Sequence, residues 1–260
     1  MIYTHDINPI LISIGFIDLY WYGAMYAISF ILIDYLMKKD NVGDDIFTVF
    51  LIDKILIVSL FSLLIGGRLG YVVFYNFDYY SENLHKVLYI WEGGMSFHGA
   101  LIGIIFGLFY ISIKEKINFL KLTDFVVIYI PIGLFLGRIG NFINSELYGS
   151  PTNASWGIIF PLIDDIPRHP SMLYEAILEG LILFYVMLVI SKSKPNKGIL
   201  TSLFLIMYSV FRTFVEFIRV PDIQIGHLYS NWLTMGMILS LPMFMLGMTL
   251  LYFSIKGRIR

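Results

Sequence analysis

The sequence predicts an all-α integral membrane protein with seven transmembrane helices. Composition is the first reason: 58% of the 260 residues are hydrophobic and only 14% are charged. The mean hydropathy of +0.77 lies above the range of soluble domains. The second reason is that apolar segments of roughly 20 residues, the length that a helix needs to cross a bilayer, recur along the chain. The third is that lysine gathers in alternate connections between these segments.

Seven segments have the length and apolar composition of membrane spans. They lie near residues 13–36, 47–75, 95–113, 122–142, 171–190, 199–218 and 231–253. The second segment is longer than a span needs and contains Asp53 and Lys54, so we expect it to begin in the inner interface and to tilt. No linker, low-complexity tract or repeat divides the sequence, which predicts one domain over residues 1–260.

The positions of lysine and arginine predict the orientation, because these residues accumulate in cytoplasmic loops. Basic residues follow the first, third, fifth and seventh spans, namely Lys38, Lys39, Lys114, Lys116, Lys121, Lys192, Lys194, Lys197, Lys256, Arg258 and Arg260. The other side holds little more than Lys86, Arg168 and Arg219. We therefore expect the N-terminus outside the cytoplasm and the C-terminus inside. No basic residue precedes Lys38, so the first span is expected to remain rather than to be removed as a signal peptide.

Polar motifs gather at the outer ends of the predicted spans, whereas the inner ends carry plain lysine clusters. The outer motifs are LYWYG (19–23), GGRLGYVVFYN (66–76), WEGGMSFHGALIG (91–103), GRIGNFINSELYG (137–149), RHPSMLYEA (168–176) and YSVFRTFVEFIRVPD (208–222). Motifs from six places in the chain that converge on one face of the membrane indicate an active or binding site toward the outer side.

Composition also excludes several kinds of chemistry. A net charge of −1 and a pI near 6.5 argue against a nucleic-acid-binding protein, which shows a basic stripe on its surface. The chain has no cysteine, which excludes disulfides, cysteine-ligated metals and a protein thiol as nucleophile. The sequence shows no spacing typical of metal ligands, and we expect no metal or cofactor.

Three arginines fall at membrane depth, where a charged group is costly to bury. They are Arg68, Arg138 and Arg212. Arginine keeps its proton, so each of them needs a partner. Arg212 and Glu216 are spaced i,i+4 and lie within ion-pair reach on one helix face. Glu175 and Glu179 of the fifth span either neutralise buried arginines or serve a site, and the sequence leaves both interpretations open.

Arg138 begins a polar helix face that continues with Asn141 and Ser145 and includes Glu146 if the helix persists. One interpretation is a structural polar network. The other is an anion site, because donors from several helices at one depth allow planar guanidinium groups to grip phosphate oxygens. The phosphate available at that depth belongs to a lipid headgroup. We therefore interpret Arg138 as a ligand of a phospholipid phosphate.

These motifs resemble those of bacterial prolipoprotein diacylglyceryl transferases. GRIGNFINSELYG is similar to the family signature, and GGMSFHGALIG, RHPSMLYEA and the RTFVEFIR-PD stretch fit the family in the same order, from WYG near the start to GHLYSNWLTMGM at 226–237. The resemblance implies a multi-pass enzyme of the bacterial plasma (inner) membrane. Such an enzyme moves diacylglycerol from phosphatidylglycerol to the lipobox cysteine in the signal peptide of a prolipoprotein and releases glycerol phosphate.

The resemblance also implies the functional positions, all of which match the family pattern. They are Tyr22, His98, Arg138, Asn141, Glu146, Gly149, Arg212 and Glu216. Other positions depart from the pattern: Ser145 and Ala100 stand where glycine is usual, Ser150 where a basic residue often follows, Met172 where glutamine is common, and Val220 where an acidic residue often precedes PD. None of these departures removes a group that the chemistry needs.

The reaction sets two requirements, since a thiolate must attack the glycerol carbon that carries the phosphodiester. A free cysteine has a pKa of roughly 8.5, so the thiol gains from a base or a cationic neighbourhood. The departing phosphate gathers negative charge, which fixed guanidinium groups stabilise. We expect Arg138 with Asn141 to bind the phosphate, and Arg212, held by Glu216, to stabilise the leaving group or the thiolate.

The remaining roles are assigned as hypotheses. His98 is the candidate base, although a structural histidine or activation of the thiol by the arginines remains open. Glu146 is expected to orient Arg138 or to bind the glycerol hydroxyls, Gly149 to contribute to the phosphatidylglycerol site, and Tyr22 to donate a hydrogen bond. A transporter or anion channel is less favoured because the inner halves of several spans are apolar. A lipid-binding scaffold would bind phosphatidylglycerol without releasing glycerol phosphate.

Overall fold

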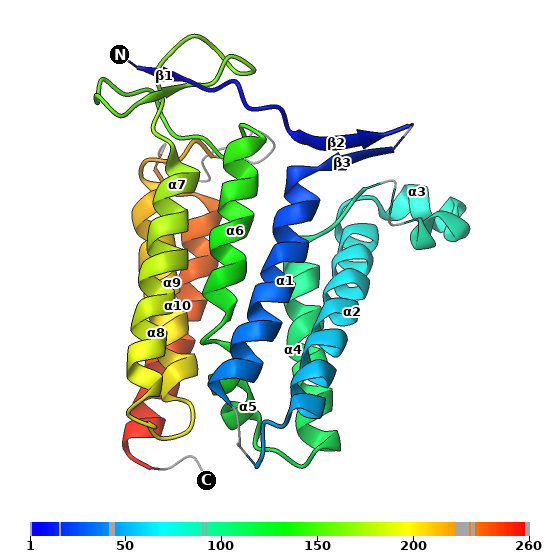
Figure 1. Cartoon of the computed structure of the whole chain (residues 1–260), viewed down its shortest axis with the longest axis vertical. Coiled ribbons are helices and arrows are strands. Elements are labelled where there is room, and N and C mark those ends of the chain that lie inside the picture. The colour runs from blue at the N-terminus through cyan, green and yellow to red at the C-terminus, as the bar shows by residue number, and fades with distance from the viewer. Residues whose placement is uncertain are drawn as a thin grey trace. The chain divides into compact units, whose positions relative to one another are not determined.

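The computed structural model describes residues 2–15, 17–41, 45–89, 91, 93–221, 229 and 232–257, apart from the side chains of Ile17 and Phe97. Within these residues, long helices make up most of the regular structure, and the strands form two small two-stranded sheets (Figure 1). The chain divides into two compact units. Residues 1–33 and 124–260 form the first unit, and residues 34–123 form the second. The single domain expected from the sequence stays a prediction.

Several helices have the length and composition of membrane spans. Among the described residues, four qualify directly, namely α2 (Val49–Phe74), the continuous run Ser171–Ser191, α9 (Ile199–Glu216) and α10 (Met235–Ile255). A fifth is a broken pair, α5 (Phe119–Val126) and α6 (Ile130–Ile143), bent by 43°. Pro131 lies in the first turn of α6, where its missing N–H is tolerated but would interrupt a continuous helix. The protein is thus a helical, multi-pass membrane protein, and the count of seven spans stays a prediction.

The first predicted span begins later than the sequence suggested. Residues Ile10–Ile14 (β2) and Ile17–Tyr20 (β3) pair as an antiparallel hairpin, and helix α1 extends from Trp21 to Asp40. Gly15 takes a left-handed φ of 64° at the turn. The expectation of a helix from residue 13 is therefore wrong. Isoleucine favours strands as well as membrane helices, so an apolar run alone does not distinguish the two.

The first unit contains the helices that carry most of the predicted site. Helix α6 packs against the fifth-span run, which consists of α7 (Ser171–Glu175), a π-helical segment η3 (Ala176–Ile182) and α8 (Leu183–Ser191), and α9 packs against α10 (Figure 1). Strand β1 (Tyr3–Thr4) pairs in parallel with β4 (Ile158–Ile159). One side chain fixes an end of this bundle. Asp124 accepts hydrogen bonds from the backbone N–H groups of Gly198 and Thr201.

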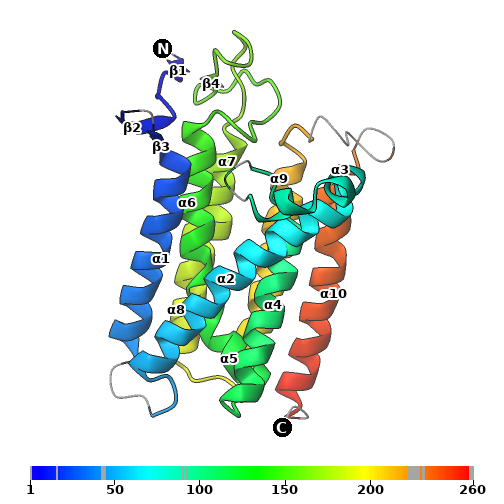
Figure 2. The same cartoon turned by 90° about the vertical axis from the view of Figure 1, so that its right-hand side faces the viewer.

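The second unit is a pair of antiparallel helices, α2 and α4 (Phe97–Lys114), together with the short helices α3 (Phe77–Glu82) and η1 (Leu84–Leu88) (Figure 2). Lys54 at the start of α2 pairs with Glu115 just after α4. At the other end, Ser96 N–H donates to Gly67 O at 2.8 Å. A Cβ atom on Gly103 would lie 2.1 Å from Ser62 O. Small residues thus let the two backbones approach closely, as is common between membrane helices.

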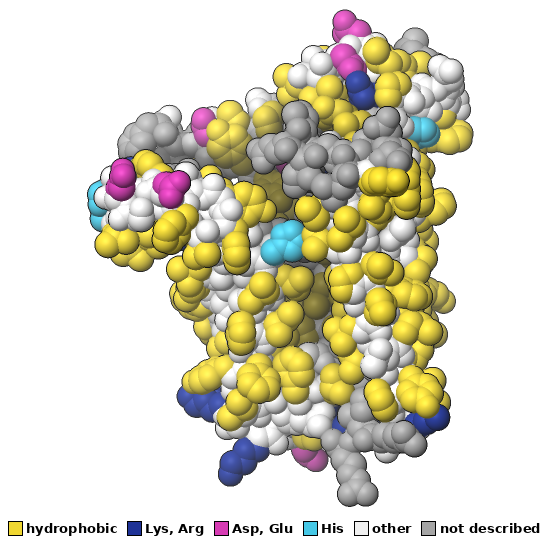
Figure 3. All heavy atoms as spheres, turned by 180° about the vertical axis from the view of Figure 1, so that it is seen from behind, with side chains coloured by type: hydrophobic (Ala, Val, Ile, Leu, Met, Phe, Trp, Pro, Cys, Tyr) yellow, Lys and Arg dark blue, Asp and Glu magenta, His cyan; other side chains and the backbone are white. Residues whose placement is uncertain are grey.

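The surface fits a membrane protein. On the face drawn in Figure 3, hydrophobic side chains cover the lengths of the helices, and lysine and arginine side chains are concentrated at the lower helix ends. Many large hydrophobic side chains are exposed, among them Phe50, Phe61, Phe106, Tyr185 and Met245. Exposed apolar side chains over whole helices are costly in water but are in contact with lipid in a bilayer.

Candidate functional site

The GRIGNFINSE signature lies at the end of α6 and in the chain that leaves it. Arg138 and Asn141 belong to the helix, which ends at Ile143, so the helical face does not extend to Glu146. Ser145 has a left-handed φ of 58°, a conformation that glycine adopts most readily, which explains why glycine is usual there in the family. The Ser145 hydroxyl is 3.2 Å from Nδ1 of His5, and this contact offsets the strain of a side chain in that conformation.

Arg138 pairs with two glutamates of the neighbouring span. Its Nε lies 3.0 Å from Glu175 Oε2, and its Nη2 donates to Glu179 Oε2 at 3.4 Å. Glu175 and Glu179 are spaced i,i+4 across the junction of α7 and η3, which places both carboxylates on the face toward α6. These glutamates therefore pair with Arg138, which is compatible with both interpretations that the sequence left open.

Arg212 makes the ion pair expected from its spacing. Its Nη2 contacts Oε1 of Glu216, and its Nη1 donates to Oε1 of Glu175. Arg219 joins the same group, with its Nη1 3.4 Å from Glu216 Oε1 and 3.8 Å from Glu175 Oε1. Sequence reasoning counted Arg219 only as an outer basic residue. Its i,i+3 spacing from Glu216 was the available signal.

Six residues thus form one arginine–glutamate cluster at the end of three spans. Its members are Arg138, Arg212, Arg219, Glu175, Glu179 and Glu216. The side chains of Glu175 and Glu179 are completely buried, whereas those of Arg138 and Arg212 keep 16% and 12% of their surface exposed. The arginine side chains are therefore the less buried partners of these two carboxylates. Such an arrangement suits a site for an anion, because guanidinium groups held by buried acceptors are fixed donors.

Glu216 has room only because residue 236 is glycine. A Cβ atom on Gly236, in the first turn of α10, would lie 2.6 Å from Glu216 Oε1. The carboxylate therefore lies against the N-terminal turn of α10, where the partial positive charge of the helix favours an anion. The sequence alone gave no reason to connect these two positions.

Asn141 and Glu146 contact each other rather than Arg138. The amide of Asn141 donates to Glu146 Oε2 at 2.9 Å, and Asn144 donates to the other carboxylate oxygen at 3.3 Å. In the part of the chain that the structure describes, the carboxylates that pair with Arg138 are Glu175 and Glu179. Orientation of Arg138 by Glu146 is thus unsupported by a direct contact. The exposed Glu146 remains suited to hydroxyl groups of a ligand.

Tyr22 and Gly149 occupy positions in the first unit, close to the signature. The Tyr22 ring packs on Gly140, where a Cβ atom would lie 2.8 Å from Tyr22 Cδ2, and its hydroxyl is 3.2 Å from that of Tyr26. Gly149 N–H donates to His169 O at 2.8 Å. A Cβ atom on Gly149 would lie 2.7 Å from the His169 side chain. Close packing therefore explains why residue 149 is glycine.

The connection after the signature is held by an ion pair between Arg168 and Asp164. Arg168 donates from Nε to both oxygens of Asp164, at 3.1 and 3.2 Å, and from Nη1 to Gly149 O at 3.4 Å. The guanidinium holds the pKa of Asp164 below its usual range. Ser150 and Val220, two departures from the family pattern, take part through their backbones, with N–H groups that donate to Ile218 and Tyr148. Met172, a third, is fully buried in a core with Ile158 and Phe160.

His98 and Arg68 belong to the second unit. His98 is the second residue of α4 and is exposed. The Arg68 side chain is buried and stacks 5.1 Å above the ring of Tyr80. Its guanidinium donates to the carbonyl oxygens of Lys86, Val87, Tyr89, Gly93 and Gly94. Five backbone acceptors account for the buried group, so Arg68 fixes the connection that leads to α4 and is not arranged to bind phosphate.

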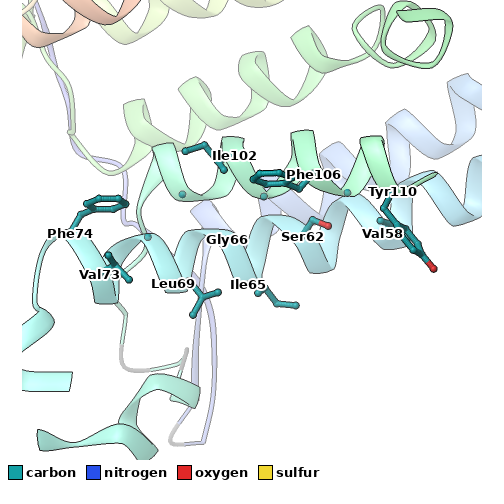
Figure 4. A pocket seen from close by; sticks show the side chains of 14 residues that line it. Val58, Ser62, Ile65, Gly66, Leu69, Val73, Phe74, Ile102, Phe106 and Tyr110 are labelled. Carbon is teal, nitrogen blue, oxygen red and sulfur yellow. The ribbon is translucent and has the colours of Figure 1, made fainter. Parts of the chain in front are cut away.

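A groove of about 550 Å³ runs between α2 and α4 (Figure 4). Glycines form its floor, and its walls are apolar side chains such as Leu69, Phe74, Ile102 and Phe106. Its lining contains no charged side chain. The groove is therefore unsuited to an anion. It belongs to the second unit, whereas the arginine–glutamate cluster belongs to the first.

The fold and the cluster define a multi-pass membrane protein with an arginine-rich site at the ends of its spans. Comparison with known proteins is consistent with this class. The sequence matches the prolipoprotein diacylglyceryl transferase family over residues 9–253. A phosphatidylglycerol–prolipoprotein diacylglyceryl transferase of Methylococcus capsulatus is 43% identical over 248 residues, which cover 94% of each chain.

Two further relatives carry the same name. The protein of Buchnera aphidicola subsp. Acyrthosiphon pisum is 46% identical over 275 residues, covering 96% of this chain and 97% of that protein. The protein of Nitratidesulfovibrio vulgaris is 43% identical over 246 residues, covering 94% of each. The chain belongs to the prolipoprotein diacylglyceryl transferase family and is a membrane transferase of lipoprotein biosynthesis. The family expected from the motifs is confirmed.

Proposed function

We propose that the chain transfers the diacylglyceryl group of phosphatidylglycerol to the lipobox cysteine of a prolipoprotein, and that the arginine–glutamate cluster binds the phosphodiester. The observation that carries the assignment is that Arg138 and Arg212, from two different spans, both pair with the fully buried carboxylate of Glu175 and keep part of their side-chain surface exposed. Guanidinium forks match phosphate oxygens in planarity and spacing. The names of the relatives support the two substrates.

The chemical step forms a thioether. The cysteine sulfur attacks the glycerol carbon that carries the phosphate, the carbon–oxygen bond breaks, and its electron pair leaves on glycerol phosphate. Arg138 and Arg212 stabilise the charge that collects on the leaving oxygen. Removing one such preorganised donor typically costs about 3–4 kcal/mol. The thiol proton goes to a base, for which His98 is the candidate, and its exposed imidazole is suited to meet a substrate.

The cluster faces the outer side of the bacterial plasma (inner) membrane in this proposal, with the N-terminus outside and the C-terminus in the cytoplasm. In the first unit, the cluster lies at the C-terminal ends of α6 and α9 and at the N-terminal end of α7. The lysine-rich connection 192–197 joins the opposite ends of α8 and α9. Lysine marks the cytoplasmic side, which supports an outward-facing site. The proposed topology has seven spans, and the hairpin of β2 and β3 precedes the first of them.

A direct assay tests the function. The purified protein is incubated with phosphatidylglycerol and a lipobox peptide, and mass spectrometry follows the peptide while glycerol phosphate release is measured. We expect a diacylglyceryl mass increase and stoichiometric glycerol phosphate, both absent when the cysteine of the peptide is replaced by serine. Lipid binding without glycerol phosphate release would indicate a scaffold and would refute the proposal.

A further inference from the structure

Glu175 occupies a position that no other described carboxylate of the cluster shares. Its side chain is completely buried, its Oε2 lies 3.0 Å from Nε of Arg138, and its Oε1 accepts from Nη1 of Arg212. Glu179 pairs with Arg138 alone among the described residues, and Glu216 pairs with Arg212 and Arg219. One carboxylate therefore joins the arginine of α6 to the arginine of α9.

The two guanidinium groups would separate without this bridge. Both are permanently charged, and like charges repel strongly where the surroundings exclude water. Each carboxylate oxygen of Glu175 lies within ion-pair distance of a different one of these two arginines, so the carboxylate limits the distance between the two groups. In the described structure, the ion pairs of Arg138 use Nε and Nη2.

We infer that Glu175 is a positioning residue that sets the spacing of Arg138 and Arg212, so that both bind one phosphodiester. The inference rests on the proposed function, because it assumes that the two arginines share a phosphate. Positioning differs from charge neutralisation. Neutralisation requires only a carboxylate near each arginine, whereas positioning requires one carboxylate that contacts both arginines at once.

Glu179 provides a matched control. It lies one helical turn beyond Glu175, is equally buried, and pairs with Arg138 at 3.4 Å, but it does not contact Arg212 in the described structure. Replacing either residue by aspartate keeps the charge and withdraws the carboxylate by one methylene. Only at residue 175 does this change remove a contact that joins the two arginines.

The experiment measures kcat and KM for phosphatidylglycerol, together with thermal unfolding, for Glu175→Asp and Glu179→Asp. A misplacement of about 1 Å typically costs about 100-fold in rate. We expect Glu175→Asp to lose about 100-fold in kcat while it unfolds near the wild-type temperature, and Glu179→Asp to lose less than about tenfold. Equal losses in the two variants, or near-normal kcat for Glu175→Asp, would overturn the inference.

A second measurement leaves residue 175 unchanged and covers the case in which the aspartate variant does not fold. If the two arginines bind one anion as a unit, the loss in kcat/KM of the double variant Arg138→Lys/Arg212→Lys should be smaller than the product of the two single losses. Losses that multiply would show independent roles and would contradict positioning by a shared carboxylate. Failure of the wild-type protein to modify the peptide would instead refute the proposed function.

Discussion

Replacing Gly236 by alanine tests whether the geometry of the cluster governs turnover. The new Cβ atom would lie 2.6 Å from Glu216 Oε1 and 2.7 Å from its Cδ, whereas ordinary contact begins at 3.4 Å. The carboxylate must therefore retreat by 0.8 Å, the difference between 3.4 and 2.6 Å. Glu216 pairs with both Arg212 and Arg219, so the retreat alters how these guanidinium groups are held.

The expected effect is large on rate and small on stability. A misplacement of about 1 Å in a catalytic arrangement costs about 100-fold in rate, so we expect kcat/KM to fall by roughly 30- to 100-fold. Crowding costs about 1–3 kcal/mol of folding free energy. Alanine returns up to about 1 kcal/mol because it is a better helix former than glycine. A net cost of up to about 2 kcal/mol is left, so the unfolding temperature should fall only modestly.

The assay compares glycerol phosphate release by Gly236→Ala with release by Gly133→Ala. Residue 133 lies in α6, and a Cβ atom there would lie 4.0 Å from Ile33 Cδ1, its nearest neighbour outside the helix backbone. The Gly133 variant should keep its activity. Full turnover by Gly236→Ala at an unchanged unfolding temperature would refute the argument that the position of Glu216 controls the site.

Three other predictions follow from the chain. If His98 is the base, the His98→Gln variant should bind phosphatidylglycerol normally and lose at least about 100-fold in rate. Part of the lost rate should return as rising pH ionises the substrate thiol. A loss that does not shrink with pH would show that the arginines, and not His98, activate the thiol. Single cysteines at the exposed positions Asn153 and Ser193 should react differently with an impermeant thiol reagent on intact cells. Asn153 should be labelled and Ser193 should not, and the reverse would overturn the orientation. Gly103→Ala places a Cβ atom 2.1 Å from a carbonyl oxygen of α2 and should destabilise the protein by about 1–3 kcal/mol in thermal unfolding, in contrast to Gly133→Ala.

The sequence predicted the spans whose signal lies in the chain itself. Length and hydropathy identified α2, α9 and α10 because a bilayer demands long apolar helices regardless of tertiary contacts. The pairing of Arg212 with Glu216 was predictable for a similar reason, since i,i+4 spacing places two side chains together on any helix.

Other features depend on contacts between distant segments. The hairpin at residues 10–20 has the apolar content of a helix, and its strand pairing becomes evident only in the fold. Pairing with a buried arginine was one of two interpretations that the sequence left open for Glu175 and Glu179, and the sequence did not say which arginine it would be. The sequence placed Arg68 at the same membrane depth as Arg138 and Arg212. The structure distinguishes it from them, because its guanidinium donates to five backbone carbonyls of η1 and of the connection that follows η1.

The charge balance of the arginine–glutamate cluster indicates how the proposed site would select an anion. Its three arginines and three glutamates carry no net formal charge among themselves, which makes burial of such a group at membrane depth tolerable. A balanced cluster exerts little long-range attraction, so affinity must come from N–H groups that meet an oxygen at close range. Phosphate offers oxygens at the spacing of a guanidinium fork. In the proposed site, selectivity for a phosphodiester would therefore depend on the placement of Arg138 and Arg212 more than on their charge, and a change that moves either group should impair the reaction even when every charge is kept.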